Sequence, residues 1–213
     1  MRTTTIRRTI GASTAALAVT LGMLTTPAMA APSVASSDTR PAIVALTKAQ
    51  KAELQRAVDA QIKRAAKKGT QTAANEVTYY SADGKVEAVA VLPLPGETIA
   101  PSYTQTANGI TSDWHGCPTF AYCFYENSNW EGARWQFWAA YEGPPGYASN
   151  YGFQDRTSSW VVNTSALYIV ADDAAPGGTG QWLWLWTTNP QSSASYVGNT
   201  NNDRMDRWWA WVA

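Results

Sequence analysis

All eleven tryptophans of this 213-residue chain lie in its last hundred residues, from Trp114 onward. The same stretch, 114–213, holds both cysteines and all four phenylalanines, but only ten valine, isoleucine, leucine and methionine residues together. Because so few aliphatic side chains cannot fill an ordinary interior, the aromatic rings must fill it. The sequence therefore predicts a C-terminal domain whose tryptophans are mostly buried, preceded by a region of different character.

The N-terminus has the pattern of a secretory signal. Arg2, Arg7 and Arg8 form a basic start, residues 10–24 are apolar, and Ala28-Met29-Ala30 is a small-x-small cleavage site. The apolar run is shorter than the roughly 18 residues of a membrane-spanning helix. We therefore expect 1–30 to be a signal peptide and the protein to be secreted and extracellular, with no membrane association after signal removal.

A helix and a hairpin are predicted between the signal and the tryptophan-rich part. Thr47 and Gln50 have the spacing of a capping box, and an apolar residue recurs every fourth position after them. Gly69 is the expected C-cap of that helix. Further on, Asp83-Gly84 is a strong hairpin-turn signal between two short runs of strand-forming residues.

These elements divide the chain into four parts. Residues 31–96, the helix and hairpin, resemble the pro-like regions that precede many actinobacterial secreted domains, and they fit equally well a small satellite packed on the main domain. The Thr/Ser/Asn-rich stretch 97–113 is expected to be a linker. The main domain is then 114–213.

Charge and cysteine content exclude several classes of function. Residues 114–213 hold four arginines, no lysine and eight acidic residues, a net charge of −4, which argues against binding to nucleic acid. Cys117 and Cys123 in an exported chain predict one disulfide. Together with the sole histidine, His115, they are too few for a structural zinc site.

Two motifs recur in the C-terminal part. Tyr125, Trp130 and Gly132 have the spacing of a folded-over hairpin in which two rings pack together and the glycine takes a backbone angle that side chains resist. The polar hexapeptides 154–159 and 202–207 each precede an aromatic or apolar strand, 48 residues apart. An aromatic hairpin followed by a polar turn, occurring twice, indicates an internal repeat.

This pattern resembles the βγ-crystallin fold and, with the Cys117-to-Cys123 opening, is similar to small secreted peptidase inhibitors that use a single βγ-crystallin domain. The resemblance implies a mainly β protein, a two-Greek-key βγ-crystallin-like sandwich preceded by the small helix and hairpin segment. The first key matches well. In the second, Tyr168 fits, but the Ala/Gly/Pro-rich loop 171–180 stands where a second aromatic corner is expected.

The resemblance implies a peptidase inhibitor whose partner is a secreted protease, some relatives being metalloproteinase inhibitors. The inhibitory loop would fall within 171–195. That stretch has no cysteine to form the second disulfide that stiffens the family's loop. We therefore assign no reactive-site residue.

Calcium is the cofactor that the resemblance suggests, because the polar hexapeptides of βγ-crystallins bind it through carboxylate, hydroxyl and backbone oxygens. Asp155, Ser158 and Asp203 fit such a site. Asp206 stands where a hydroxyl is expected, and Arg207 places a positive charge near the ion. The alternative is that both turns are closed by hydrogen bonds alone.

A glycan-binding function is a further alternative. Trp182, Trp184 and Trp186 alternate with two leucines, so in a strand the three indoles share one face. If that face is exposed, the indoles suit stacking on a cell-wall polysaccharide. If it faces inward, they belong to the core, which the shortage of aliphatic residues favours.

No catalytic set is apparent, and we expect a protein that is not an enzyme. His115 cannot be assigned to a Ser-His-Asp triad. Glu126 and Glu131 could form a carboxylate pair for glycoside chemistry, but they are better placed on a solvated turn.

Overall fold

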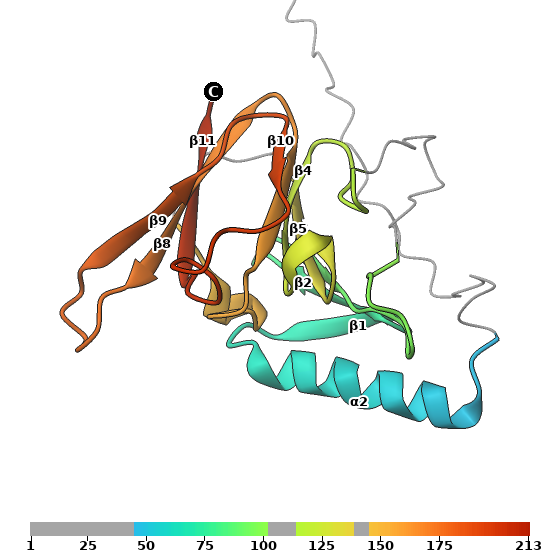
Figure 1. Ribbon diagram of the computed structural model, residues 1–213. Coiled ribbons are helices and arrows are strands. Elements are labelled where there is room, and N and C mark those ends of the chain that lie inside the picture. The colour runs from blue at the N-terminus through green and yellow to red at the C-terminus, as the bar shows by residue number, and fades with distance from the viewer. Residues whose placement is uncertain (1–44, 102–113, 139–144) are drawn as a thin grey trace, which may run out of the picture. The chain divides into compact units, whose positions relative to one another are not determined.

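The computed structural model describes residues 45–101, 114–138 and 145–213, which form one α-helix and two antiparallel β-sheets (Figure 1). The predicted signal peptide and residues 102–113 of the predicted linker lie outside the described residues. Within the described ranges, no helix is long and apolar enough to cross a membrane.

The helix and strands follow one another in a fixed order along the chain. They are α2 (Lys48–Arg64), β1 (Gly69–Ala73), β2 (Glu76–Tyr80), β3 (Val86–Val91), β4 (Ala121–Tyr125), η1 (Ser128–Trp130), β5 (Arg134–Trp138), β6 (Gly146–Tyr147), η2 (Ala148–Tyr151), β7 (Ser159–Asn163), β8 (Leu167–Ala174), β9 (Trp182–Thr187), β10 (Ser192–Ala194) and β11 (Arg207–Val212).

Helix α2 begins at the predicted capping box. The Thr47 side chain accepts a hydrogen bond from the Gln50 backbone, and the Gln50 side chain accepts one from the Thr47 backbone. The C-cap, however, is Ala65 and not Gly69. Gly69 instead opens β1, where a Cβ would lie 2.6 Å from a methyl group of Val77, so the glycine permits close strand packing rather than ending the helix.

The N-terminal hairpin extends the sheet of the C-terminal part. Strands β2 and β3 pair around the predicted turn, and Gly84 there has a φ of +79°. β3 then pairs along its length with β5, from Ala88 opposite Phe137 to Val91 opposite Arg134. The helix-hairpin segment and the tryptophan-rich part therefore share one sheet, while the division of the chain at 96 and 113 stays a prediction.

The strand order shows two interlocked Greek keys. The first sheet has the order β1-β2-β3-β5-β4-β7-β10 and the second has β6-β11-β8-β9. Each key has four consecutive strands, β4 to β7 and β8 to β11. The third strand of each key, β6 or β10, pairs in the sheet of the other key. The predicted mainly β, two-key sandwich is confirmed.

Aromatic rings fill the space between the sheets. Phe153 packs on Trp135 with ring centroids 4.9 Å apart, and Trp208 packs on Phe137 at 4.7 Å. The indole of Trp208 also donates a hydrogen bond to the buried hydroxyl of Tyr122. Only two of the eleven tryptophans are more than a third exposed, so the ring-filled core that the composition predicts is present.

Candidate functional site

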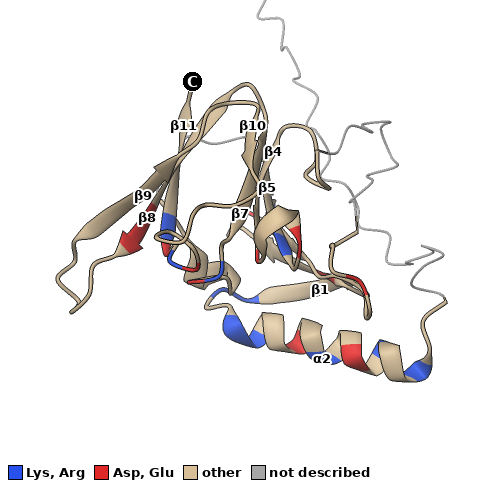
Figure 2. Cartoon of the chain, viewed as in Figure 1, with Lys and Arg blue, Asp and Glu red and all other residues tan. Residues whose placement is uncertain are grey.

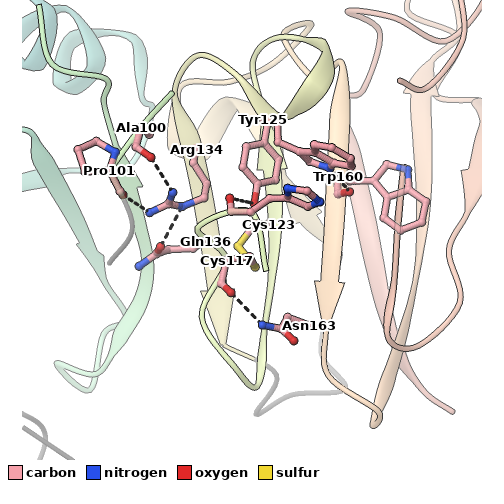
Figure 3. The surroundings of a disulfide bond; sticks show 11 residues. Ala100, Pro101, Cys117, Cys123, Tyr125, Arg134, Gln136, Trp160 and Asn163 are labelled. Carbon is pink, nitrogen blue, oxygen red and sulfur yellow. Dashed lines mark hydrogen bonds between the residues drawn. A yellow bond between two sulfur atoms is a disulfide. The ribbon is translucent and has the colours of Figure 1, made fainter. Parts of the chain in front are cut away.

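A short disulfide-closed loop precedes the first key (Figure 3). Cys117 and Cys123 are bonded, as the sequence predicts. The Tyr125 hydroxyl donates to the His115 carbonyl, and the Asn163 side chain donates to the Cys117 carbonyl, so the loop is tied to β4 and β7. Tyr125 and Trp130 belong to the same cluster around this disulfide, where the ring that stacks on Trp130 is that of His115.

A fully buried arginine joins the N-terminal segment to the first key. The Arg134 guanidinium donates to the backbone carbonyls of Ala100 and Pro101 and to the side chain of Gln136 (Figure 3). Beside it, the Gly132 N–H donates to the Thr98 carbonyl. A buried charge without partners is costly, so the carbonyls of residues 98–101 stabilise the fold by accepting these hydrogen bonds.

The two polar hexapeptides occupy equivalent strand junctions, one before β7 and one before β11. Asp155 and Asp203, the second residue of each, both have left-handed backbone angles, with φ of 54° and 53°. The Asp155 N–H donates to the Met205 carbonyl, and the Asp203 N–H donates to the Thr157 carbonyl. These reciprocal bonds between the second and fourth residues confirm an internal repeat.

The same repeat identifies the residue of the second key that is equivalent to Tyr125. The Ser158 N–H donates to the Tyr125 carbonyl, and the equivalent Asp206 N–H donates to the Asp172 carbonyl. Asp172, and not Tyr168, is therefore the counterpart of Tyr125. The prediction at Tyr168 was wrong because it followed ring chemistry, whereas an acidic residue occupies this corner in the second key.

An acidic cluster lies between the two turns. Asp155, Asp173 and Asp206 each place a carboxylate oxygen within 4.8 Å of the others. Asp206 is 8% exposed; its Oδ2 accepts a hydrogen bond from the Ala174 N–H, and its Oδ1 has no hydrogen-bond partner. Three carboxylate oxygens, one of them from the buried Asp206, are the hard donors that Ca²⁺ prefers.

Burial and mutual repulsion act on this cluster together. Burial raises the pKa of Asp155 above its usual value, and the negative charges of Asp206 and Asp173 raise it further. Burial also raises the pKa of Asp206, as does the neighbouring Asp173, whereas the hydrogen bond from the Ala174 N–H and the nearby Gln154 side chain lower it. The cluster is thus short of positive charge, although Arg204 donates two hydrogen bonds to Asp173 at 3.0 and 2.6 Å.

The predicted calcium residues are divided between two places. The Ser158 hydroxyl donates to the Glu126 carbonyl at 2.8 Å and lies 3.4 Å from Oδ1 of Asp203, while Asp155 belongs to the acidic cluster. Asp173 was missed because its motif position is visible only once the repeat is aligned by hydrogen bonds. The Arg207 guanidinium donates to Asp172 at 2.9 Å.

The β8–β9 hairpin is held rigidly at its base and open at its tip. The salt bridges from Arg204 and Arg207, with the bond from Ala174 to Asp206, fix the end of β8. Residues 176–181 are all exposed, and the turn projects away from the rest of its sheet (Figure 1). This turn lies inside the stretch 171–195 expected to hold an inhibitory loop.

A β-bulge divides the three alternating tryptophans of β9. Trp186 lies opposite Ala171 and is buried, whereas Trp184 lies opposite the next residue, Asp172, and is 66% exposed. The extra residue, Leu185, points into the core at 3% exposure. The prediction that Trp182, Trp184 and Trp186 share one face was therefore wrong, because the bulge resets the alternation.

The residues considered for catalysis serve structural contacts. The His115 ring stacks on Trp130 with centroids 3.4 Å apart, and burial lowers the pKa of this histidine. Glu126 forms a salt bridge with Arg156 and accepts a hydrogen bond from the Ala133 N–H. Glu131 is half-buried in the turn after η1, where its backbone N–H donates to the Ser128 carbonyl.

Comparison with known proteins points to one family. Residues 111–183, about a third of the chain, match the model of peptidase inhibitor family I36. No curated protein matches this chain.

Solved βγ-crystallin domains are similar to part of the chain. One, from work on the evolution of the eye lens βγ-crystallin domain fold, is 17% identical with a TM-score of 0.35, over 46% of this chain and 91% of that one. Another, from Clostridium beijerinckii, is 22% identical with a TM-score of 0.33, over 43% of this chain and 97% of that one. The match over 111–183 and the two-key topology together confirm that this chain resembles a βγ-crystallin-like peptidase inhibitor family.

Proposed function

We propose that this protein is a secreted, non-enzymatic inhibitor of an extracellular peptidase. The observation that carries the proposal is the match of residues 111–183 to a peptidase inhibitor family. The disulfide between Cys117 and Cys123 is compatible with an extracellular protein.

The β8–β9 turn is the element that we propose enters the peptidase. An inhibitor binds tightly when its loop is ordered beforehand, because less conformational entropy is lost on binding. Here the base of the hairpin is fixed by two arginine–aspartate salt bridges. That clamp supports presentation of residues 176–181 without the second disulfide that the resemblance leads one to expect.

The experiment is a titration of one thermolysin-like and one subtilisin-like peptidase with the purified protein at up to micromolar concentration. A variant in which residues 176–180 are replaced by Asn-Gly is expected to lose at least about tenfold in inhibition. Gly84→Ala is the matched control, because it alters another exposed hairpin turn where a Cβ meets nothing within 4 Å. No inhibition of either peptidase class by the unaltered protein would refute the proposal.

Calcium binding is a second candidate function, favoured by the unpartnered buried oxygen of Asp206 within the acidic cluster. Asp155, Asp173 and Asp206 would hold the ion, which would supply the positive charge that this cluster lacks. Arg204 competes for Asp173, so we propose an affinity lower than that of a site free of arginine.

Isothermal titration with CaCl₂ tests this second candidate. We expect heat of binding and a rise in melting temperature for the unaltered protein, because a ligand that binds only the folded state stabilises it. Asp206→Asn should remove both effects. Asp59→Asn, which neutralises one carboxylate on the exposed face of α2, should keep them. Absence of heat and of a thermal shift in the unaltered protein would exclude calcium.

A further inference from the structure

The outer face of the four-stranded sheet is covered by aromatic side chains from four strands. Residues directly opposite each other in antiparallel strands share a face, so the register defines the members of this face. We call it the outer aromatic face. Its residues, in rows across the sheet, are Tyr147, Arg207, Asp172 and Trp184, then Trp209, Val170 and Thr187, then Trp211 and Tyr168, with Trp182 continuing β9 beyond Trp184.

The two faces of this sheet have opposite exposure. On the inner face, Trp208, Ile169 and Trp186 are at most 8% exposed. On the outer face, Trp184 is 66% and Trp211 is 45% exposed. Trp184 and Trp211 therefore do not contribute to the ring-filled core. Exposed aromatic side chains gathered on one face are typical of a binding surface.

Charge on the outer aromatic face is internally compensated. Its charged members are Arg207 and Asp172, joined at 2.9 Å, with side chains only 16% and 10% exposed. In Figure 2 the rest of β9 and β11 carries no charged residue. A face of zero net charge gives no electrostatic attraction to an acidic or basic partner, so its complement is a neutral ligand.

The arginine also fixes the rings in place. The Arg207 guanidinium lies 3.8 Å from the ring centroid of Trp182 and 5.4 Å from that of Trp209, and Trp209 stacks on Trp211 at 5.9 Å. The Trp184 indole donates to the Thr187 hydroxyl at 3.0 Å. The platform is therefore ordered before any ligand arrives, which lowers the entropic cost of binding.

We propose that the outer aromatic face binds a neutral polysaccharide. The C–H faces of pyranose rings are flat and apolar and stack on indoles, while the hydroxyls of Tyr147 and Tyr168 remain at the same face for hydrogen bonds with the sugar. From β9 to β11 is two strand spacings, about 10 Å. Trp211 also lies four residues along β11 from Arg207, which shares a row with Trp184, and this adds about 13 Å along the strand. Trp184 and Trp211 are thus separated by about 16 Å, which suits well-spaced units of an extended chain better than a single sugar.

The test is retention of the full protein on insoluble cellulose and on insoluble chitin. The double substitution Trp184→Ala and Trp211→Ala should reduce the bound fraction at least about tenfold, and both positions are exposed enough to leave folding intact. Phe120→Ala is the matched control, because Phe120 is 63% exposed but lies before β4 in the other sheet. Circular dichroism confirms that each variant is folded.

Two results would overturn the proposal. One is that neither polysaccharide retains the unaltered protein, or that Phe120→Ala weakens retention as much as the double substitution. The other is that no polysaccharide binds but the aromatic substitutions abolish a different interaction. Loss of binding to phosphatidylcholine vesicles would assign the face to a lipid surface, and loss of self-association in sedimentation equilibrium would assign it to a second copy of this chain. Peptidase inhibition by Trp211→Ala should be unchanged, since this residue lies far along β11 from the β8–β9 turn, so this proposal and the proposed inhibition fail independently.

Discussion

The two sheets of this molecule place their aromatic and charged residues differently. In the seven-stranded sheet, large side chains are buried on both faces: Trp135 packs in the core between the sheets, and Arg134, the preceding residue of β5, is buried on the opposite face against Ala100 and Pro101. In the four-stranded sheet, aromatic rings cover both faces and acidic residues gather at one end. We infer that the seven-stranded sheet chiefly stabilises the fold, and we propose that the four-stranded sheet presents groups to a partner.

The difference follows from where the N-terminal segment adds its strands. Because β3 pairs with β5, the first key has no free edge on that side, and the helix packs Val58 into the common core. Among the described residues no strand is added to the four-stranded sheet, in which β9 is the last strand in order and pairs with β8 beside the projecting turn. Within the part of the chain that the structure describes, the N-terminal segment thus adds strands to one sheet of the two-key fold and none to the other.

The largest expected effect is at Arg134, which is completely buried and donates three hydrogen bonds. Arg134→Met keeps the stem but leaves the carbonyls of Ala100 and Pro101 without this donor. We expect a loss of about 3 kcal/mol in the free energy of unfolding, measured by urea denaturation. Arg56→Met, on the exposed face of α2, is the control and should cost less than about 0.5 kcal/mol. Similar losses in both variants would remove Arg134 from its assigned role.

A pair of glycine substitutions compares the two sheets directly. Gly132 and Gly177 both have positive φ, +75° and +84°, but a Cβ at Gly132 would lie 2.8 Å from Cβ of Glu126, whereas at Gly177 it meets nothing within 4 Å. We expect Gly132→Ala to cost about 2–4 kcal/mol and Gly177→Ala about 1 kcal/mol. Thermal melting of both variants measures the difference, and equal costs would contradict the assignment of Gly132 to a tightly packed corner.

Removing the disulfide should have a smaller effect. Cys117 and Cys123 close a loop with a sequence separation of six, so the chain-entropy argument gives about 2 kcal/mol for the double serine variant. The loss belongs to the first key, where the loop is tied to β4 and β7. Inhibition of a peptidase, measured below the melting temperature, should survive in this variant, and its disappearance would show that this loop, and not the β8–β9 turn, contacts the enzyme.

The smallest effect is expected in the acidic cluster and depends on pH. Because the pKa of Asp155 is raised in the folded state, the folded protein holds more protons than the unfolded chain above the usual aspartate pKa, and stability falls as the pH rises through that interval. Asp155→Asn should therefore stabilise the protein at pH 7, by less than about 1 kcal/mol since Asp155 is exposed, and the gain should shrink near pH 3. A variant less stable at pH 7 than the unaltered protein would contradict this account.

Sequence reasoning reached the fold through composition and spacing. The excess of tryptophan over aliphatic residues predicted the ring-filled core, and the two polar hexapeptides predicted a repeat that the bonds of Asp155 and Asp203 confirm. Thr47 and Gln50 predicted the start of α2 because capping is a local interaction. These signals can be read from composition or from local spacing, without knowing which strands pair.

Features that depend on pairing between distant strands escaped prediction. The bulge that turns Trp186 inward arises from the register of β8 with β9, which no alternation within β9 reveals. The joining of β3 to β5 and the partners of Arg134 likewise depend on residues more than thirty positions apart. Asp173 also comes close to Asp155 and Asp206 only through the pairing of β8 with β11, which the sequence around Asp173 does not reveal.

The most direct test of the difference between the sheets is hydrogen–deuterium exchange of the protein alone and in complex with a peptidase that it inhibits. We predict that the complex protects amides of the β8–β9 hairpin, within 174–182, and leaves α2 and the β2–β3 hairpin unchanged. Protection confined to α2 or to β1–β3 would place the peptidase on the seven-stranded sheet and contradict the division of roles proposed for this molecule.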